Sequence, residues 1–342
     1  MKRETFVFSQ KKVDYLFDAS FNEIENFFPK EKIIIITDDN LFKHHATRFE
    51  AYKVITIPHG EAHKQQATID NIVQQLLAFE ADKQSCIVGV GGGVVTDMAG
   101  YAASIFKRGT KLALAPTSIL AMVDAAIGGK NGIDVGPYKN MVGTVHQPDV
   151  LLFDYSFLST LPTEEWVNGF AEIVKHACIK DADLFDLLQQ NTIEKFMADK
   201  AAIAALVERN VAIKTSVVLQ DEFETGDRKL LNFGHTIGHA IENIYHLPHG
   251  HAVSIGMVAA CNISEEINNF YSVDKEKIVK LLEQYRLPVK INIDTDKIWE
   301  LLLMDKKRNA GNMNFILLNK IGDATIVPIG LIQLKQLVKE SL

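Results

Sequence analysis

The first half of the chain alternates short apolar runs with helical patterns, and this alternation constrains the fold more than any other feature of the sequence. The short apolar runs occupy 32–38, 52–58, 85–93 and 111–118. Between the second and third runs, one face of a helix is marked by Ile69, Ile72, Val73, Leu76 and Leu77. Such alternation predicts a parallel sheet covered on both faces. Ligands of these sheets bind at the carboxyl ends of the strands, where the loops of this segment fall.

From about Leu161 the pattern becomes helical. Pro162, followed by Glu164 and Glu165, is typical of the first turn of a helix. Long helical patterns then cover 164–190, 193–220, 232–246 and 250–270, and a β-hairpin is predicted from the apolar runs at 314–319 and 323–329. We therefore expect an α/β domain over residues 1–160, a mostly helical domain over 161–342, and an active site in the cleft between them.

Composition narrows the class of protein. A chain of 342 residues with 47% hydrophobic and 23% charged residues is ordinary for a soluble globular protein. Its net charge of −7 argues against nucleic acid or an anionic membrane as the main partner. The three cysteines are widely separated, which is typical of free thiols in a reducing cytoplasm. The first residues lack the apolar run typical of a signal peptide, and no apolar run is long enough to span a membrane, so we expect neither feature.

Five of the eleven histidines fall between His235 and His251. His235 and His239 are four residues apart in a predicted helix, so both imidazoles project from one face. Two histidines on one helical face, with a third such as His249 following shortly after, form a typical divalent-metal motif. The alternative is a helix with surface and capping histidines, and the crowding of five in one segment favours a metal site.

Glu172 and Lys175 are three residues apart in GFAEIVKHACIK, so they share one helical face. They could form an ordinary surface ion pair. However, the surrounding Phe170, Ala171, Ile173, Val174 and Ala177 make this helix apolar almost all round. A carboxylate buried there needs a strong partner, and a metal ion would provide one for Glu172.

A triple-glycine turn, Gly91-Gly92-Gly93, follows the third apolar run and precedes a helical segment. Such a turn lets backbone N–H groups approach an anion at the helix end, although a tight structural turn is an equal alternative. The Rossmann fingerprint is not met, because Val94 stands at the last glycine position. Polar loops also follow the neighbouring strands, at 59–64 and at 116–118. Three polar loops at one sheet edge favour a nucleotide site.

Basic groups gather in two places despite the negative net charge. Lys130, Lys139 and Asn140 stand in a glycine-rich, loop-like segment that suits oxyanion binding or is simply solvated. Lys214, Glu224, Arg228 and Asn232 precede the histidines, and the spacings of four and three lead from Arg228 through Asn232 to His235. Arg228 is suited to bidentate capture of a carboxylate or phosphate. The later run 305–308 is basic as well, although an isolated run of this kind is more often a solvated turn.

The motifs that carry these residues resemble those of the 3-dehydroquinate synthases, a family of sugar phosphate cyclases. The matching segments follow the family's order along nearly the whole chain: GEAHK (60–64), GGGVVTDMAG (91–100), FKRGT (106–110), PTSILAMVDAAIGGKNGID (116–134), GPYKNMVGTVHQP (136–148), GFAEIVKHACIKD (169–181), DEFETGDRKLLNFGHTIGHAIE (221–242), LPHGHAVSIGM (247–257) and DKK (305–307). The resemblance implies an NAD- and zinc-dependent lyase of the shikimate pathway. Such an enzyme converts 3-deoxy-D-arabino-heptulosonate 7-phosphate to 3-dehydroquinate and phosphate.

The resemblance also implies a role for individual residues. The zinc ligands would be Glu172, His235 and His249, with Co2+ as a conceivable substitute. NAD would be held by Glu61, Lys64, Gly93, Val94, Val95, Thr96, Asp97, Thr117, Ser118, Lys130, Lys139, Phe157, Leu158, Ser159 and Thr160. The positions used around the substrate are Asp124, Lys130, Asn140, Lys175, Lys214, Arg228, Asn232 and His239. Arg108 matches an arginine that reaches a neighbouring subunit's site, which implies a homodimer.

The implied chemistry agrees with the cationic clusters, because the substrate carries a phosphate and a carboxylate. NAD would oxidise the substrate transiently, phosphate would leave by elimination, the hydride would return, and an intramolecular aldol would close the ring. His239 is the candidate proton shuttle, since an imidazole titrates near neutral pH. The substrate's own phosphate could serve as the base instead. Either Lys306 or Lys307 would contact the substrate.

Three positions depart from the family's usual pattern: Thr96 replaces a common glycine, Ser118 replaces a threonine, and His251 stands where a glutamate is usual. His249 and His251 therefore compete for the third ligand position, and His249 is the better match. Two other functions remain open. One is a sugar phosphate cyclase that makes an inosose or valiolone, and the other is a metal-dependent NAD polyol dehydrogenase. Arg228 and Lys214 favour the carboxylate-bearing substrate.

Overall fold

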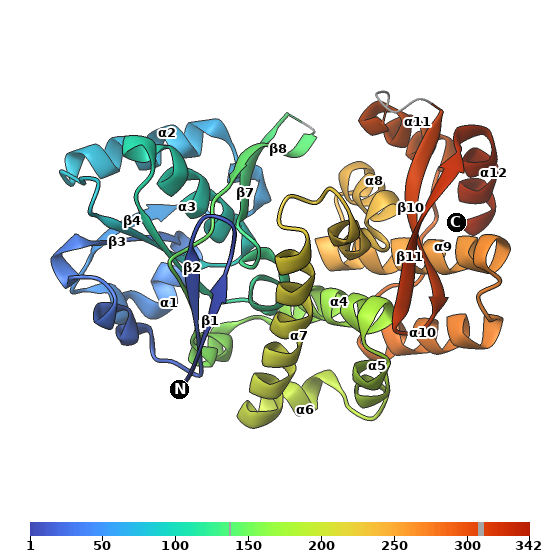
Figure 1. Ribbon diagram of the computed structural model, residues 1–342, viewed down its shortest axis with the longest axis horizontal. Coiled ribbons are helices and arrows are strands. Elements are labelled where there is room, and N and C mark those ends of the chain that lie inside the picture. The colour runs from blue at the N-terminus through green and yellow to red at the C-terminus, as the bar shows by residue number, and fades with distance from the viewer. Residues whose placement is uncertain (137, 307–310) are drawn as a thin grey trace. The chain divides into compact units, whose positions relative to one another are not determined.

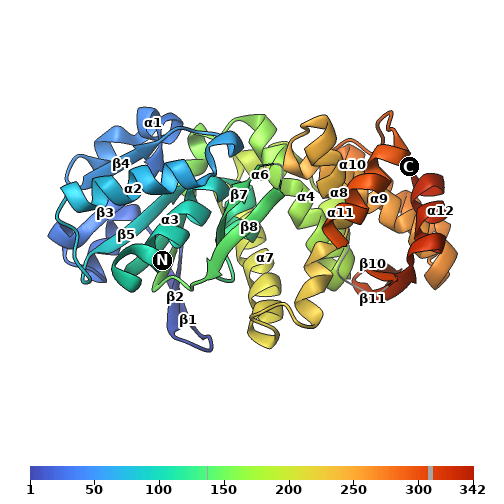
Figure 2. The same cartoon turned by 90° about the horizontal axis from the view of Figure 1, so that it is seen from above.

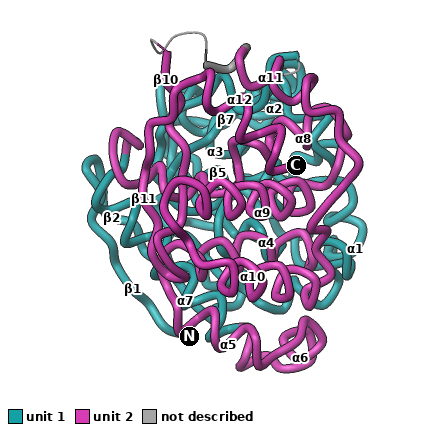
Figure 3. Tube along the Cα trace, turned by 90° about the vertical axis from the view of Figure 1, so that its right-hand side faces the viewer, with its two compact units in different colours: residues 1–165, 204–222 teal, residues 166–203, 223–342 magenta. Residues whose placement is uncertain are grey.

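The computed structural model describes residues 1–136, 138–306 and 311–342, without the side chains of 304–306. The chain forms two compact units, of which unit 1 comprises residues 1–165 and 204–222 and unit 2 comprises 166–203 and 223–342 (Figure 3). No helix in these described stretches has the length and apolar character needed to cross a membrane. The first segment of unit 1 ends at residue 165 rather than at the expected 160, and unit 1 also contains 204–222.

Unit 1 is built on a sheet whose strands β1 to β4 are labelled in Figure 1. The sheet has seven strands in the order β1-β2-β9-β6-β5-β3-β4. Only β1 runs antiparallel to its neighbour, β2, and the remaining pairs are parallel. The strands are β1 (Lys2–Val7), β2 (Lys12–Phe17), β3 (Ile33–Asp38), β4 (Lys53–Ile57), β5 (Cys86–Gly91), β6 (Lys111–Pro116) and β9 (Val150–Phe153). All residues of β5 are buried, so the central sheet is covered on both faces as predicted.

The helices of unit 1 follow the strands in the expected alternation (Figure 2). They are α1 (Asp39–Phe49), α2 (Gln66–Ala78) and α3 (Gly93–Ile105), with short helical turns η1 (Phe21–Asn26), η2 (Lys30–Lys32), η3 (Glu61–His63), η4 (Phe106–Arg108), η5 (Ala121–Ala125) and η6 (Tyr155–Thr160). A separate antiparallel ribbon, β7 (Lys130–Val135) and β8 (Tyr138–Val145), also belongs to this unit. The expectation of a loop at 128–148 is therefore wrong, because β7 and β8 pair with each other.

Helix α7 (Lys200–Gln220) was expected to belong wholly to the helical domain, yet most of it packs in unit 1. Lys214 Nζ donates to both the backbone oxygen and Oδ1 of Asp124, each at 2.6 Å. Glu208 pairs with Lys2 at 3.0 Å. Beyond the helix, Glu222 accepts from the amide of Ser9 at 2.9 Å. The hydrophobic residues of α7 do not mark one distinct apolar face, and polar residues such as Asn210 and Lys214 are among those buried, so sequence alone could not assign the helix to a unit.

Unit 2 is mostly helical, as predicted. Its elements are α4 (Thr163–Lys180), α5 (Ala182–Gln189), α6 (Ile193–Ala198), η7 (Asp227–Asn232), α8 (His235–Tyr245), α9 (His249–Asn268), α10 (Ser272–Gln284), α11 (Thr295–Lys306), α12 (Leu331–Ser341) and the predicted hairpin β10 (Asn312–Lys320) and β11 (Asp323–Gly330). Side chains from α8, α9, α11, α12 and the hairpin share one core, which includes Ile241, Ile263, Leu317 and Leu334.

Two expected helices, 164–190 and 193–220, are each divided, the second at Asp199 between α6 and α7, and a third begins later than expected. The pattern at 164–190 breaks at Asp181, whose side chain accepts from the amide of Leu184 at 2.9 Å and caps α5. The pattern at 232–246 begins instead at His235, because Gly234 adopts a left-handed φ of 76°. Arg228 and Asn232 therefore lie on the separate turn η7, and the helical spacing that linked them to His235 does not apply.

Helices α8 and α9 pack closely because glycines line their contact. A Cβ at Gly256 of α9 would lie 2.0 Å from the backbone oxygen of Gly234, so no side chain fits there without separating the helices. By contrast, a Cβ at Gly330 would have its nearest neighbour at 3.7 Å. The histidine-bearing ends of these helices depend on this close approach.

We expect Gly256→Ala to destabilise the protein by about 2–3 kcal/mol, since a methyl group forced against backbone must displace a helix. Gly330→Ala is the matched control, with an expected change below about 1 kcal/mol because the site is open. Urea unfolding of both variants measures the difference. Equal stabilities would show that the α8–α9 contact can relax at little cost.

Candidate active site

Helix α4 carries two charged side chains on a buried surface. Residues 166–179 are all buried, and Glu172 and Lys175 have exposed fractions of 0% and 1%. The Lys175 ammonium pairs with Oε2 of Glu172. The expectation that this helix buries both charges is therefore confirmed.

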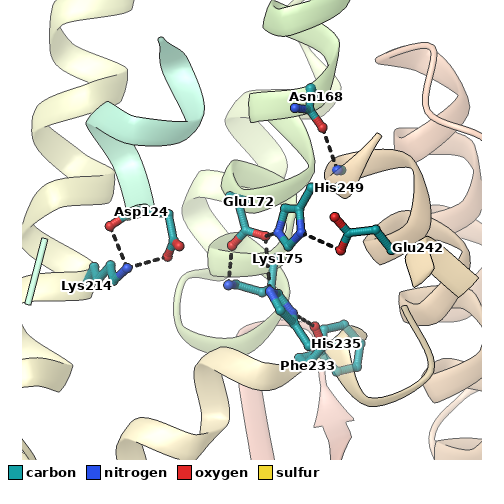
Figure 4. Close-up of polar contacts among 10 residues, drawn as sticks. Asp124, Asn168, Glu172, Lys175, Lys214, Phe233, His235, Glu242 and His249 are labelled. Atoms are coloured by element: carbon teal, nitrogen blue, oxygen red, sulfur yellow. Dashed lines mark hydrogen bonds and ion pairs between the residues drawn. The ribbon is translucent and has the colours of Figure 1, made fainter. Parts of the chain in front are cut away.

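Two histidines approach the other carboxylate oxygen of Glu172 from separate helices (Figure 4). His235, the first residue of α8, places Nε2 3.5 Å from Oε1 of Glu172. His249, the first residue of α9, places Nε2 3.3 Å from the same oxygen. Loop residues 246–248 between the two helices bring both rings to α4. The three predicted metal ligands therefore lie together.

The spacing of these three donors suits a tetrahedral ion. With ligand distances of about 2.0–2.1 Å, neighbouring ligand atoms of a zinc site lie about 3.3–3.4 Å apart. The Glu172–imidazole separations of 3.3 and 3.5 Å agree with that value. Two nitrogens and one carboxylate oxygen are also a donor set typical of catalytic zinc, which keeps a fourth position for substrate or water. The residues present therefore fit a divalent cation.

The second nitrogen of each imidazole is also engaged. His235 Nδ1 lies 3.1 Å from the backbone oxygen of Phe233, and His249 Nδ1 lies 3.2 Å from Oε2 of Glu242 (Figure 4). Hydrogen bonds at Nδ1 leave both Nε2 atoms directed at Glu172. Metal-binding histidines are commonly held by acceptors of this kind.

Electrostatics set the charge on each group. Burial raises the pKa of Glu172, but the Lys175 ammonium and the two imidazoles outweigh it and hold that pKa well below its ordinary value. Burial and the Lys175 ammonium hold the pKa of His235 well below its ordinary value, so this ring is neutral near pH 7. Burial lowers the pKa of His249, while hydrogen bonds to Glu172 and Glu242 raise it to about 9. A bound cation would take the place of that proton.

His239 and His251 are two further histidines of the same cluster. The exposed ring of His239 lies one helical turn after His235, with ring centroids 5.1 Å apart, and 6.0 Å from the His249 ring. It also forms a donor group with Glu242 and His249. Among the described residues, His251 belongs to neither donor group that contains His249. His249 rather than His251 thus lies with the other two predicted ligands, Glu172 and His235.

Predicted cofactor residues of unit 1 gather at the carboxyl edge of the sheet. Gly93 opens α3, and the amide of Thr117 donates to the oxygen of Gly91 at 3.0 Å, which joins the loop after β6 to the glycine turn. Ser118 Oγ accepts from the amide of Ala121 at 3.2 Å. Thr96 Oγ1 donates to the oxygen of Gly93 at 3.0 Å inside α3, which agrees with a helical backbone at this position.

A buried cation lies beside the glycine turn. Lys64, with an exposed fraction of 5%, donates from Nζ to Asp97 Oδ2 and to Asn140 Oδ1, each at 2.6 Å. Glu61 lies 4.0 Å from the same ammonium and 3.6 Å from that of Lys139. Burial lowers the pKa of Lys64, but Asp97 and Glu61 outweigh it and raise that pKa, so the lysine is charged. Three other predicted residues, Glu61, Asp97 and Asn140, therefore meet around the Lys64 ammonium, and Lys139 joins the group through Glu61.

The other predicted residues of unit 1 lie in three places. Phe157–Thr160 form the end of η6, where Thr160 Oγ1 lies 2.8 Å from His45 Nε2. Asp124 in η5 pairs with Lys214. Lys130 begins β7 and is exposed, as is Arg108, which has a left-handed φ of 62°.

In unit 2, Arg228 is buried in η7, and Asn232 at its end donates to Glu224 Oε1 at 2.7 Å. Lys306 and Lys307 were expected near the substrate, but their side chains lie outside the part of the chain that the structure describes.

Sequence reasoning missed three residues that support these groups. Glu242 contacts His249, Asp134 Oδ1 accepts from the amide of Asn140 at 2.7 Å, and His45 contacts Thr160. Only Glu242 had a usable signal. It follows His235 by seven residues, two helical turns, and therefore shares the face of His235 and His239.

Comparison with known proteins identifies the family. Residues 54–168 match the domain described as 3-dehydroquinate synthase N-terminal, and residues 169–308 match the one described as 3-dehydroquinate synthase C-terminal. The chain belongs to the 3-dehydroquinate synthase family. The 3-dehydroquinate synthase of Campylobacter curvus is 38% identical over 327 residues, 93% of each chain. That of Pyrococcus abyssi is 40% identical over 274 residues, 80% of each chain.

Solved structures agree with this assignment. A 2-deoxy-scyllo-inosose synthase, complexed with carbaglucose-6-phosphate, NAD+ and Co2+, is 26% identical with a TM-score of 0.86, and the match covers 100% of both chains. A 2-epi-5-epi-valiolone synthase from Streptomyces hygroscopicus, with NAD+ and Zn2+ bound, is 26% identical with a TM-score of 0.88 over 99% of this chain and 98% of that one. A probable glycerol dehydrogenase from Sinorhizobium meliloti shares only the fold, at 16% identity and a TM-score of 0.61 over 95% of each chain. The predicted fold class is confirmed.

Proposed function

We propose that this chain is a 3-dehydroquinate synthase, which converts 3-deoxy-D-arabino-heptulosonate 7-phosphate to 3-dehydroquinate and phosphate in the shikimate pathway. The observation that carries the proposal is the group Glu172–His235–His249, whose spacing suits a catalytic divalent cation. Its family relatives are named for this activity. The related inosose and valiolone synthases hold NAD+ with Co2+ or Zn2+, so we propose NAD and zinc as cofactors here.

Each cofactor has a proposed set of residues. Glu172, His235 and His249 would hold the metal, and Lys64, Asp97 and the glycine turn would hold NAD. When bound, NAD would supply reversible hydride transfer with the substrate, and the metal ion would supply polarisation of a substrate hydroxyl. Since the hydride returns, the overall reaction is redox-neutral, and phosphate elimination makes the enzyme a lyase.

The chain's own side chains would bind and orient the substrate. The buried guanidinium of Arg228 is suited to a carboxylate or phosphate, and the Lys214 ammonium, held by Asp124, adds a second positive charge. His239 is exposed beside the two ligand imidazoles, so it can exchange protons with solvent and with substrate. The Lys175 ammonium holds Glu172 in its ionised form, which is the form that binds a cation.

We also propose that the protein forms a homodimer in the cytoplasm. Lys107 and Arg108 both adopt left-handed backbone conformations, with φ of 51° and 62°, at the exposed end of η4. This turn directs Arg108 away from the core of unit 1, which is compatible with a contact to a second subunit. Sedimentation of the purified protein tests the oligomeric state.

We expect phosphate release from the heptulosonate phosphate alone. Purified protein loaded with zinc and NAD is incubated with that substrate or with carboxylate-free sugar phosphates, while released phosphate and absorbance at the NADH maximum are followed. A cyclase that makes an inosose or valiolone would release phosphate from a carboxylate-free substrate. A polyol dehydrogenase would accumulate NADH without releasing phosphate. Either result would overturn the assignment.

A further inference from the structure

Glu242 makes a close contact with the ring of a proposed metal ligand, and nothing in the proposed mechanism requires it. Its side chain is buried, with an exposed fraction of 7%, in the third turn of α8. Oε2 lies 3.2 Å from Nδ1 of His249, whose Nε2 lies 3.3 Å from Glu172 (Figure 4). The imidazole of His249 is therefore held between two carboxylates, one at each nitrogen.

A neutral imidazole carries its proton on one nitrogen and a lone pair on the other. A carboxylate at Nδ1 accepts the N–H there and so leaves the lone pair at Nε2, which faces Glu172. We infer that Glu242 is a positioning residue that fixes the tautomer and ring orientation of His249 for metal binding. This inference rests on the proposed function, because it takes His249 as a ligand.

Besides the contacts of its ring with Glu172 and Glu242, His249 is held through its backbone. Its backbone is fixed because the next amide, that of Gly250, donates to Oδ1 of Asn168 on α4 at 2.5 Å (Figure 4). A Cβ at Gly250 would lie 2.1 Å from the Asn168 backbone oxygen, so the start of α9 can approach α4 only with glycine there. The backbone contact places the Cα atom of His249 but leaves its ring free to rotate. The Glu242 contact restricts that rotation.

His235 provides an internal comparison. Its Nδ1 is held by the backbone oxygen of Phe233 at 3.1 Å, two residues away in the chain. His249 begins its helix after Pro248, and its Nδ1 is met by a side chain from a different helix. The orientation of His249 can therefore be altered by mutation, whereas that of His235 depends on the backbone.

The test measures zinc affinity of the full chain, stripped of metal, by competition with a chromophoric chelator. We compare wild type, Glu242→Met, which removes the acceptor at similar size, and Glu242→Gln, whose amide oxygen still accepts the Nδ1 proton. Glu265→Gln, a partly buried glutamate of α9 paired with Lys275, is the matched control. Mutation of a side chain that hydrogen-bonds a metal-binding histidine typically lowers metal affinity by about 10–100-fold. We expect a loss in that range for Glu242→Met, a change within a few-fold for Glu242→Gln, and none for Glu265→Gln.

A spectroscopic readout separates positioning from a structural role. In nitrogen-15 NMR of the zinc-loaded wild type and Glu242→Gln proteins, His249 should appear as the Nδ1–H tautomer. Circular dichroism checks the fold of each variant. If Glu242→Met does not fold, Glu242→Gln decides alone: retained affinity with the Nδ1–H signal supports the inference, and a loss as large as that of His249→Ala overturns it.

The outcomes also separate this inference from the proposed metal site. If His249→Ala binds zinc as tightly as wild type, the metal site itself is wrong. If His249→Ala loses zinc while a folded Glu242→Met binds it within twofold of wild type, the site stands and the role given to Glu242 is wrong.

Discussion

His249→Ala should lose its zinc and its turnover, whereas His251→Ala should retain both. His249 supplies one of three protein donors around the proposed cation, so its removal leaves two and should weaken zinc binding by more than about 100-fold, beyond the effect of an outer partner. His251 is two residues further along α9, and side chains at that spacing project from different faces of a helix.

Metal content after dialysis, measured by atomic emission, checks this prediction together with phosphate release from the heptulosonate phosphate. His251→Ala is the matched control, because it removes an identical side chain from the same helical turn. Equal zinc loss in the two variants would contradict the assignment of His249 as the ligand.

Lys64→Met should destabilise unit 1 by about 2–3 kcal/mol and weaken NAD binding. The change removes the ammonium that pairs with Asp97 at 2.6 Å, where the two side chains have exposed fractions of 6% and 16%. Breaking a fully buried pair costs about 3–5 kcal/mol, and the residual exposure of Asp97 reduces the expected value. Urea unfolding measures the stability, and fluorescence titration measures NAD affinity.

The stability lost in Lys64→Met should depend on pH in a defined direction. Burial raises the pKa of Asp97 above its ordinary value, and Lys64 partly offsets this effect. Without Lys64 the pKa should rise further, so the folded state gains stability when Asp97 binds a proton. The deficit of Lys64→Met relative to wild type should therefore shrink as the pH falls from neutral toward the pKa of Asp97.

Lys32→Met is the control, since Lys32 pairs with Asp82 at the same 2.6 Å but with side-chain exposed fractions of 35% and 49%. Solvent-exposed pairs contribute little to stability, so we expect Lys32→Met to be nearly as stable as wild type. If Lys64→Met and Lys32→Met are equally stable, the burial of the Lys64–Asp97 pair does not increase its contribution to the stability of the protein.

Several parts of the fold could be predicted because their signals are local. Strands β3 to β6 appear as apolar runs of the right length, and the parallel sheet follows from their alternation with helices. The ribbon β7–β8 was missed because its glycines and charged residues lack the alternation of a half-buried strand. Its pairing is a contact between two segments, which neither segment encodes alone.

The candidate metal group could likewise be predicted only in part from the sequence. The helical spacing of His235 and His239 and the apolar surroundings of Glu172 mark these residues as unusual, and the family resemblance selects His249. Glu242 could be placed on the same face of α8, but its contact with His249 depends on how α9 begins.

The sequence by itself determined the classes of local structure, the family and most of the residues that carry its chemistry, because periodicity, turn residues and motif order are written along the chain. The tertiary structure alone decided that most of α7 joins the sheet unit, that Lys64 gathers Asp97 and Asn140, and that Glu242 holds His249. These facts depend on which surfaces meet after folding. Burial and hydrogen bonding between distant segments select one packing partner for each surface from the many that the local pattern would permit.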